Sequence, residues 1–158
     1  MKVIESFYPN FLNNLADELC VVRSKLSKNV YTGNKDRGDR EVEISRLGIL
    51  AELIARQQCD EKNLYAKFTP MIDLNPLPEP DLYLNNKSYD IKGVRYDDNC
   101  LRINADAFEN PDKKCDYYWF IVPEIEYVKS YIVSRDEVLN EWKKVKSKYT
   151  DVYIHRIN

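Results

Sequence analysis

The chain has 158 residues, a length that suits one domain with a single core. Apolar residues make up 44% and charged residues 32%, which excludes a disordered chain, and no apolar stretch reaches the roughly 18 residues that span a bilayer. A net charge of −2 disfavours binding to nucleic acid through bulk positive charge and leaves room for a local basic surface around a site.

The cysteines and the single histidine exclude several kinds of metal site. Cys20, Cys59, Cys100 and Cys115 are far apart and form no CxxC pair, and His155 is the only histidine. A structural zinc site needs about four such ligands at short spacings, so we expect free thiols. Acidic residues interrupt the apolar pattern of the N-terminus and disfavour a signal peptide, so we expect a cytoplasmic protein without membrane contact.

The first half of the chain predicts two helices joined by a loop. Apolar residues recur at helical spacing over 9–27 and again over 41–58, so we expect a helix in each range. The segment 28–40 carries two glycines and several basic residues with little apolar content, which predicts a mobile basic loop. Residues 64–68 predict a short strand, and four prolines exclude regular structure over 70–80.

From residue 81 the apolar pattern changes to period two, which predicts strands. Residues 81–84 and 89–94 flank Asn85-Asn86-Lys87, a sequence typical of a hairpin turn. The whole chain, 1–158, is expected to form one α/β domain with a mixed central sheet flanked by helices. The further elements that we expect are strands at 100–103, 117–123, 127–133 and 152–154, and a capped helix from Ser134 to about 148.

The hairpin is expected to gather two carboxylates and a lysine on one face. Side chains alternate along a strand, so Asp90 and Lys92 point the same way and Ile91 points the other way. The tight turn brings Asp81, at the start of the preceding strand, close to them. The alternative is a hairpin edge that carries only a solvated salt bridge.

These residue types together suit phosphodiester hydrolysis. Asp81 and Asp90 offer oxygen ligands for Mg²⁺, with Mn²⁺ as a substitute, and the backbone carbonyl of Ile91 is a further candidate ligand. Such a cation acidifies a bound water and neutralises phosphate charge. Lys92, kept protonated by the carboxylates, would orient the water and stabilise the charge on phosphate.

The position of this acid-x-Lys triplet distinguishes it from three others in the chain. Only Asp90-Ile91-Lys92 lies in a strand pattern whose partner strand opens with Pro80-Asp81. The others follow a helix, sit in a loop or lie inside a helix, and they are Asp60-Glu61-Lys62, Asp112-Lys113-Lys114 and Glu141-Trp142-Lys143.

The order of a helical glutamate, Pro-Asp, Asp-x-Lys-Gly and an aromatic strand resembles the restriction-endonuclease-like PD-(D/E)xK superfamily. The resemblance covers roughly residues 41–123. It implies a restriction-endonuclease-like fold and a metal-dependent DNA endonuclease, with Asp81, Asp90 and Lys92 as its core site. The choice of DNA over RNA comes from this resemblance alone.

Members of that superfamily often add a glutamate from a preceding helix, and two positions compete for this role. Glu52 has the small neighbours Gly48, Ala51 and Ala55, which would let a metal site approach the helix closely. Glu43 lies on the main apolar stripe near the helix start. We favour Glu52 as a catalytic and metal-binding residue, with Glu43 as the alternative; a solvent-facing Glu52 paired with Arg56 at i+4 is a third interpretation.

Two further expectations concern partners. Lys35, Arg37, Arg40 and Arg95 are candidate contacts to DNA, although the loop that holds the first three can equally be a plain connector. A chain of this size has little room for a recognition domain, so a two-fold homodimer is a natural way to cut two strands. The competing function is a nuclease-fold protein with a decayed site that binds nucleic acid or protein.

Overall fold

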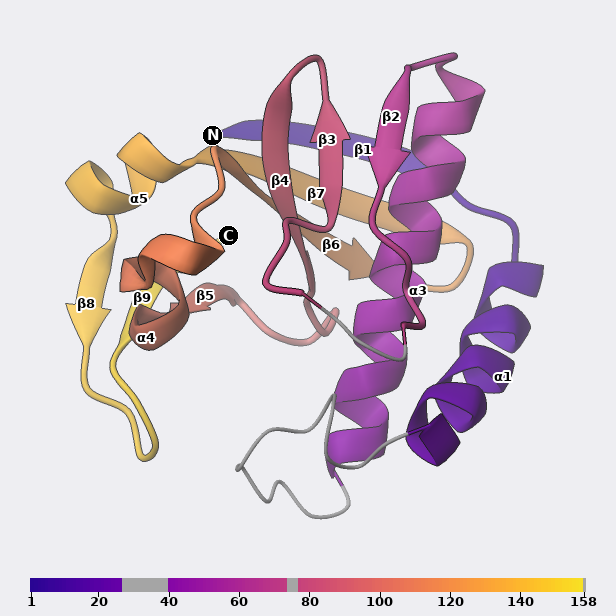
Figure 1. Cartoon of the computed structure of the whole chain (residues 1–158), viewed down its shortest axis with the longest axis horizontal. Helices are drawn as coiled ribbons and strands as arrows, with labels where there is room; N and C mark the ends of the chain where they lie inside the picture. The colour runs from indigo at the N-terminus through magenta and orange to yellow at the C-terminus, as the bar shows by residue number, and fades with distance from the viewer. Residues whose placement is uncertain (27–39, 74–76, 158) are drawn as a thin grey trace.

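A computed structural model describes residues 1–26, 40–73 and 77–157, with the side chains of 40 and 41 excepted (Figure 1). Its helices and strands follow the apolar periodicities of the chain closely. In chain order they are β1 (Lys2–Phe7), α1 (Phe11–Leu26), α3 (Arg40–Glu61), β2 (Ala66–Phe68), β3 (Leu82–Leu84), β4 (Lys87–Gly93), β5 (Cys100–Asn104), α4 (Ala105–Glu109), the 3₁₀ turn η1 (Pro111–Lys113), β6 (Tyr117–Pro123), β7 (Tyr127–Ser134), α5 (Arg135–Glu141), β8 (Lys143–Val145) and β9 (Val152–Arg156).

A six-stranded mixed sheet forms the centre of the molecule, with the strand order β1-β7-β6-β4-β3-β2. The β4–β6 pair is parallel and the other pairs are antiparallel. The wholly apolar segment 117–123 is the inner strand β6, and all of its residues after Tyr117 are buried. The prediction of an α/β chain with a mixed central sheet flanked by helices is therefore confirmed.

The prediction of only one sheet was wrong. Strand β5 pairs with β9, and β9 pairs with β8, in a separate three-stranded antiparallel sheet. In β5, Leu101 and Ile103 are buried while Arg102 and Asn104 are exposed, so the strand has one apolar face. Such a face specifies burial but not the partner strand, which here comes from the far end of the chain.

The helix expected over 134–148 is also shorter than predicted. Its capping box is present, because the Ser134 side chain accepts a hydrogen bond from Glu137 N and the Glu137 carboxylate accepts one from Ser134 N. The helix ends at Glu141, and Trp142 turns inward so that its ring lies 5.6 Å from that of Phe120. The next three residues form β8, and strand β1 and helix α4 are two further elements that the sequence analysis missed.

Two hydrophobic cores lie on opposite faces of the six-stranded sheet. Helices α1 and α3 cover one face, and α4, α5 and the small sheet lie on the other side (Figure 1). We call the core beneath α1 and α3 the helix-side core, and the core on the other face the second core. Strand β6 contributes to both, because Trp119 and Ile121 point into the helix-side core while Tyr118, Phe120 and Val122 point into the second.

The β3–β4 hairpin is built by a turn of two asparagines. Asn85 and Asn86 have φ values of 50° and 60°, the left-handed conformation that a two-residue hairpin turn requires and that asparagine tolerates. The resulting register pairs Leu82 with Tyr89. Asp81, the residue before Leu82, therefore lies beside Asp90, the residue after Tyr89.

None of the described helices is long and apolar enough to cross a membrane.

Candidate functional site

Asp81 lies immediately before β3 and its backbone is fixed by the neighbouring strand. Thr69 donates to the Asp81 carbonyl oxygen at 3.0 Å through its backbone N–H and to Pro80 O at 2.6 Å through its hydroxyl. The Asp81 side chain turns toward β4, where its Oδ2 accepts a hydrogen bond from Ile91 N at 2.6 Å. The hairpin thus brings Asp81 to β4, as the sequence predicts.

Asp90 and Lys92 share one face of β4. They lie in register with Tyr118 and Phe120, whose side chains belong to the second core, whereas Ile91 belongs to the helix-side core. The Lys92 Nζ lies 2.5 Å from Asp90 Oδ2, and both side chains are about one-third exposed, at 35% and 29%. The salt bridge of the alternative expectation is therefore present between Asp90 and Lys92, and both of its side chains are partly exposed.

Glu52 reaches the site from the helix side. Its side chain is only 16% exposed and lies 3.8 Å from the Arg23 guanidinium, with Arg56 also close enough to act on its charge. The interpretation of Glu52 as a solvent-facing residue is therefore wrong, although Arg56 does act on its charge. Asp90 and Asp81 both interact electrostatically with Glu52, which joins it to the hairpin carboxylates.

Glu43 lies elsewhere on the same helix. Its side chain is 58% exposed and lies 3.7 Å from the Arg95 guanidinium. Glu43 does not act on the charge of Asp81 or Glu52. Of the two competing glutamates, the structure brings Glu52 to the two aspartates.

The small residues around Glu52 act differently from our expectation. Ala51 and Ala55 are fully buried in the helix-side core, but a methyl group added at Gly48 would meet nothing within 4 Å. The close approach between α3 and the sheet occurs at Gly93 instead, where an added Cβ would lie 2.6 Å from the Leu47 carbonyl oxygen. The glycine that packing requires therefore follows Lys92 in β4.

The carboxylates of the site destabilise each other's charge. Burial, and then the charges of Asp90 and Glu52, raise the pKa of Asp81 to about 8, although the Ile91 hydrogen bond opposes the shift. Burial also raises the pKa of Glu52, against the lowering effect of Arg23 and Arg56. At neutral pH the apo site therefore tends to retain a proton on Asp81.

Lys92 remains the cation of the site. Burial alone would lower its pKa, but the charge of Asp90, a hydrogen bond to Asp90 and the charge of Asp81 together raise its pKa above the ordinary value. This direction agrees with the expectation that Lys92 stays protonated. An ammonium of this kind is suited to a phosphate oxygen.

The chemistry of the donors fits a hard divalent cation, while their spacing is incomplete. Carboxylates that cannot all ionise side by side are stabilised by a shared positive charge. Across the described ranges, however, no three Asp, Glu, His or Cys residues come close enough together to hold one ion. Mg²⁺ commonly uses only one or two protein carboxylates together with water and substrate phosphate.

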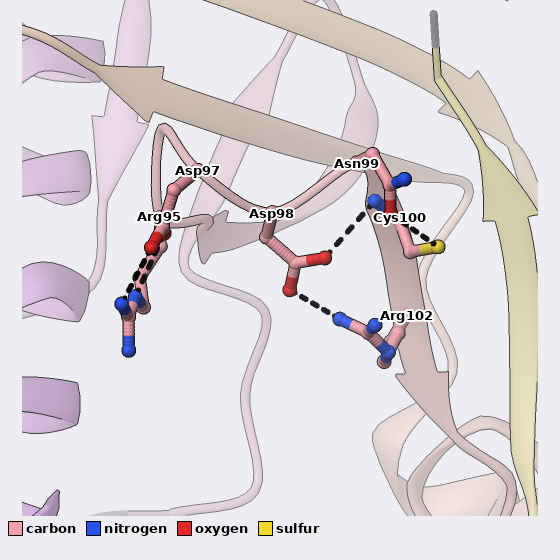
Figure 2. Close-up of polar contacts among 6 residues, drawn as sticks. All are labelled: Arg95, Asp97, Asp98, Asn99, Cys100 and Arg102. Atoms are coloured by element: carbon pink, nitrogen blue, oxygen red, sulfur yellow. Dashed lines mark hydrogen bonds and ion pairs between the residues drawn. The ribbon is translucent and has the colours of Figure 1, made fainter.

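Only one of the four candidate DNA contacts has its side chain among the described residues. Lys35 and Arg37 lie outside them, and so does the side chain of Arg40, the first residue of α3. Figure 2 shows that Arg95 is paired with Asp97, at 3.0 and 2.7 Å. In the same loop, Asp98 binds Arg102 and Cys100 N, so the whole turn is stabilised by its own acidic residues (Figure 2).

Sequence reasoning missed several residues around the site. Cys115, Tyr118 and Arg135 form the surroundings of Asp90 and Lys92 on the second-core face. Burial and then the charge of Asp90 raise the pKa of the Cys115 thiol to about 11, so it is an inert group. No local pattern marks these residues, because they come from the segment before β6, from β6 itself and from α5. No family model, curated protein or solved structure matches the chain.

Proposed function

We propose that this protein is a metal-dependent DNA endonuclease of the restriction-endonuclease-like type, with Asp81, Asp90, Lys92 and Glu52 as its active site. The observation that carries the proposal is the hydrogen bond from Ile91 N to Asp81 within a cluster of three mutually repelling carboxylates beside a lysine that is paired with Asp90. Such a cluster is costly for an apo protein, and pKa values shifted in this way are typical of functional sites.

The two aspartates would hold Mg²⁺, or Mn²⁺ in its place, with the Ile91 carbonyl as a further candidate ligand. When bound, the cation would supply an acidified water and neutralise charge on the scissile phosphate. The Ile91 N–H fixes the orientation of Asp81. Glu52, held by Arg23 at 3.8 Å, supplies a third negative charge from the helix side, directly or through water.

Lys92 would act on the phosphate and on the attacking water. Its ammonium is paired with Asp90, and its raised pKa keeps it charged across the neutral range. In the reaction it would donate hydrogen bonds to the non-bridging oxygens that gain negative charge. A lysine held in this way is a poor general base, because it has no tendency to release its proton.

A binding protein with a decayed site is the second candidate, and one observation favours it. Lys92 lies 2.5 Å from Asp90 and Arg23 lies 3.8 Å from Glu52, so internal cations already compensate part of the negative charge. On this account the cluster is structural and needs no metal. Calorimetry with Mg²⁺ in the presence of DNA separates the two candidates, because a decayed site binds none.

The test of the nuclease proposal uses single charge-neutralising variants. Cleavage of plasmid DNA is expected with Mg²⁺ or Mn²⁺, only weakly with Ca²⁺, and not in excess chelator. Asp81→Asn and Asp90→Asn should each lower the rate by about 10²-fold or more, because each removes a charged ligand. Asp112→Asn is the matched control, since Asp112 lies in an exposed acid-x-Lys triplet of η1 and should leave the rate unchanged.

Two outcomes would overturn this assignment. Cutting that persists in excess chelator would exclude a metal mechanism. Loss of cutting in Asp112→Asn as large as in Asp81→Asn would place the reaction elsewhere or identify a contaminating nuclease. Thermal melts of all three variants show whether the folded state is retained.

A further inference from the structure

A cavity lies on the helix-covered face of the sheet, beside the C-terminal end of α3. Its floor is made by neighbouring strands in register, since Tyr89 pairs with Tyr117 and Trp119 pairs with Ile132. Gln58, in the last turn of α3, forms its wall. The cavity has a volume of about 670 Å³, within the range of small-molecule sites.

The floor of this cavity is aromatic. The rings of Tyr89 and Tyr117 are stacked with centroids 5.0 Å apart and planes 19° apart, and the Trp119 indole follows on the same face. A stacked pair of rings in the cavity lining favours a flat, unsaturated ligand that can extend the stack. Aliphatic or branched ligands would make less contact with these rings.

The cavity also contains buried polar groups that require partners. Gln58 and Trp119 both line it, and they are only 2% and 4% exposed. Gln58 Nε2 donates to Ser6 Oγ at 2.7 Å, which fixes the amide. Gln58 Oε1 and Trp119 Nε1 are buried and have no hydrogen-bond partner within the described part of the protein. An acceptor and a donor left unpaired in this way each destabilise the folded protein.

We propose that this cavity binds the base of a nucleotide. One edge of a nucleobase carries a hydrogen-bond acceptor next to a donor, which complements the indole N–H of Trp119 and the amide oxygen of Gln58. The flat ring system would stack against the tyrosine pair. Lys2 and Lys62 are exposed lining residues of the cavity, and their ammonium groups suit a phosphate.

This site is separate from the carboxylate cluster and does not rest on the proposed nuclease function. Tyr89 and Asp90 are consecutive residues of β4, so their side chains point to opposite faces of the sheet. Tyr89 faces the cavity, whereas Asp90 faces the second core side. Occupation of the cavity and cleavage of DNA can therefore be measured independently.

The test uses the two tryptophans as reporters at the two faces. In a ¹⁵N-labelled sample of the full chain, each indole N–H gives one signal, and the Trp119→Phe and Trp142→Phe variants assign them. The four common nucleoside 5′-monophosphates are titrated separately, with ribose 5-phosphate as the control that lacks a base. At least one nucleotide should shift the Trp119 signal saturably, with a Kd below about 1 mM, and leave the Trp142 signal in place.

A pair of variants tests the hydrogen-bonding edge. Gln58→Leu should weaken the binding of that nucleotide about tenfold, because one buried hydrogen bond is lost. Gln57→Leu is the matched control, since Gln57 is the neighbouring residue and does not line the cavity. Melting curves of both variants confirm that they are folded under the conditions of the titration.

Three results would overturn the proposal. If none of the four nucleotides gives a saturable shift of Trp119, the unpaired groups are satisfied by internal water alone. If ribose 5-phosphate gives the same shift, the rim lysines bind phosphate and the cavity does not read a base. If both indole signals move together, the ligand acts on the protein as a whole.

Discussion

The charge state of Asp81 connects the electrostatics of the site to the stability of the protein. Its carboxyl has a pKa of about 8 in the folded chain and an ordinary value of 3.8. Below both values the carboxyl is protonated in the folded and unfolded states. Between them the unfolded chain loses the proton while the folded chain keeps it, so the free energy of unfolding falls as pH rises.

We therefore expect the apo protein to lose stability between about pH 4 and pH 8, by up to about 1.4 kcal/mol per pH unit from this group. Asp81→Asn removes this loss and should be more stable than the original chain at pH 8. Asp116→Asn is the control with the opposite sign, because hydrogen bonds from Ser88 lower the pKa of Asp116. Urea midpoints measured in chelator across the pH range test this loss of stability. The prediction would be contradicted if Asp81→Asn left the pH profile of the midpoint unchanged.

The two glutamates of α3 provide a second test at the scale of single residues. Glu52 lies with the aspartates and is largely buried, whereas Glu43 is exposed beside Arg95. Glu52→Gln should therefore weaken Mg²⁺ affinity and slow cleavage. Glu43→Gln should change only stability, by about 1 kcal/mol or less. Cleavage assays and melts on both variants give the answer, and loss of activity in Glu43→Gln alone would reverse the assignment.

At the scale of the elements, the hairpin and the two long helices could be predicted because their signals are local. Apolar spacing alone marks α1 and α3, and Asn85-Asn86 marks the turn that sets the register of β3 and β4. The relation of Asp90 to Lys92 follows from strand alternation. The pairing of β5 with β9 could not be predicted, because it joins segments about fifty residues apart and no local rule selects the partner.

The contact between α3 and β4 leads to a prediction about two glycines. A Cβ at Gly93 would lie 2.6 Å from Leu47 O and 2.8 Å from Leu47 Cγ, so Gly93→Ala forces the helix away from the strand. We expect it to lower the free energy of unfolding by about 1–3 kcal/mol. Gly48→Ala, in the helix interior with open space around it, should raise the free energy of unfolding by up to about 1 kcal/mol.

Chemical denaturation of both variants measures these effects. Opposite signs for the two substitutions are the expected result. Equal tolerance of both would mean that the helix packs less closely against β4 than the structure indicates. The rate of DNA cleavage by Gly93→Ala should also be measured, because Gly93 directly follows Lys92 in β4.

At the scale of the whole molecule, the candidate site lies where the two cores meet. Glu52 comes from the helix-side core, whereas Asp90 and Lys92 face the second core together with Cys115 and Tyr118. The sequence predicted the hairpin residues of this site from alternation. Its arginines and its second-core surroundings come from distant segments, and only the tertiary fold brings them together. The integrity of the site should therefore depend on both cores at once.

The two tryptophans can test whether the cores unfold as one unit. Trp119 is buried in the helix-side core and Trp142 in the second core, and β6 contributes side chains to both. In Trp142→Phe the fluorescence reports the helix-side core, and in Trp119→Phe it reports the second core. We expect the urea transition of each variant by fluorescence to coincide with its own transition by far-UV circular dichroism, because a strand shared by both cores couples their unfolding. Comparison within each variant removes the effect of the substitution on stability. If Trp142 reports a transition at lower urea than the circular dichroism does, the small sheet and α5 open first, and Asp90 and Lys92 lose their surroundings before the helices unfold.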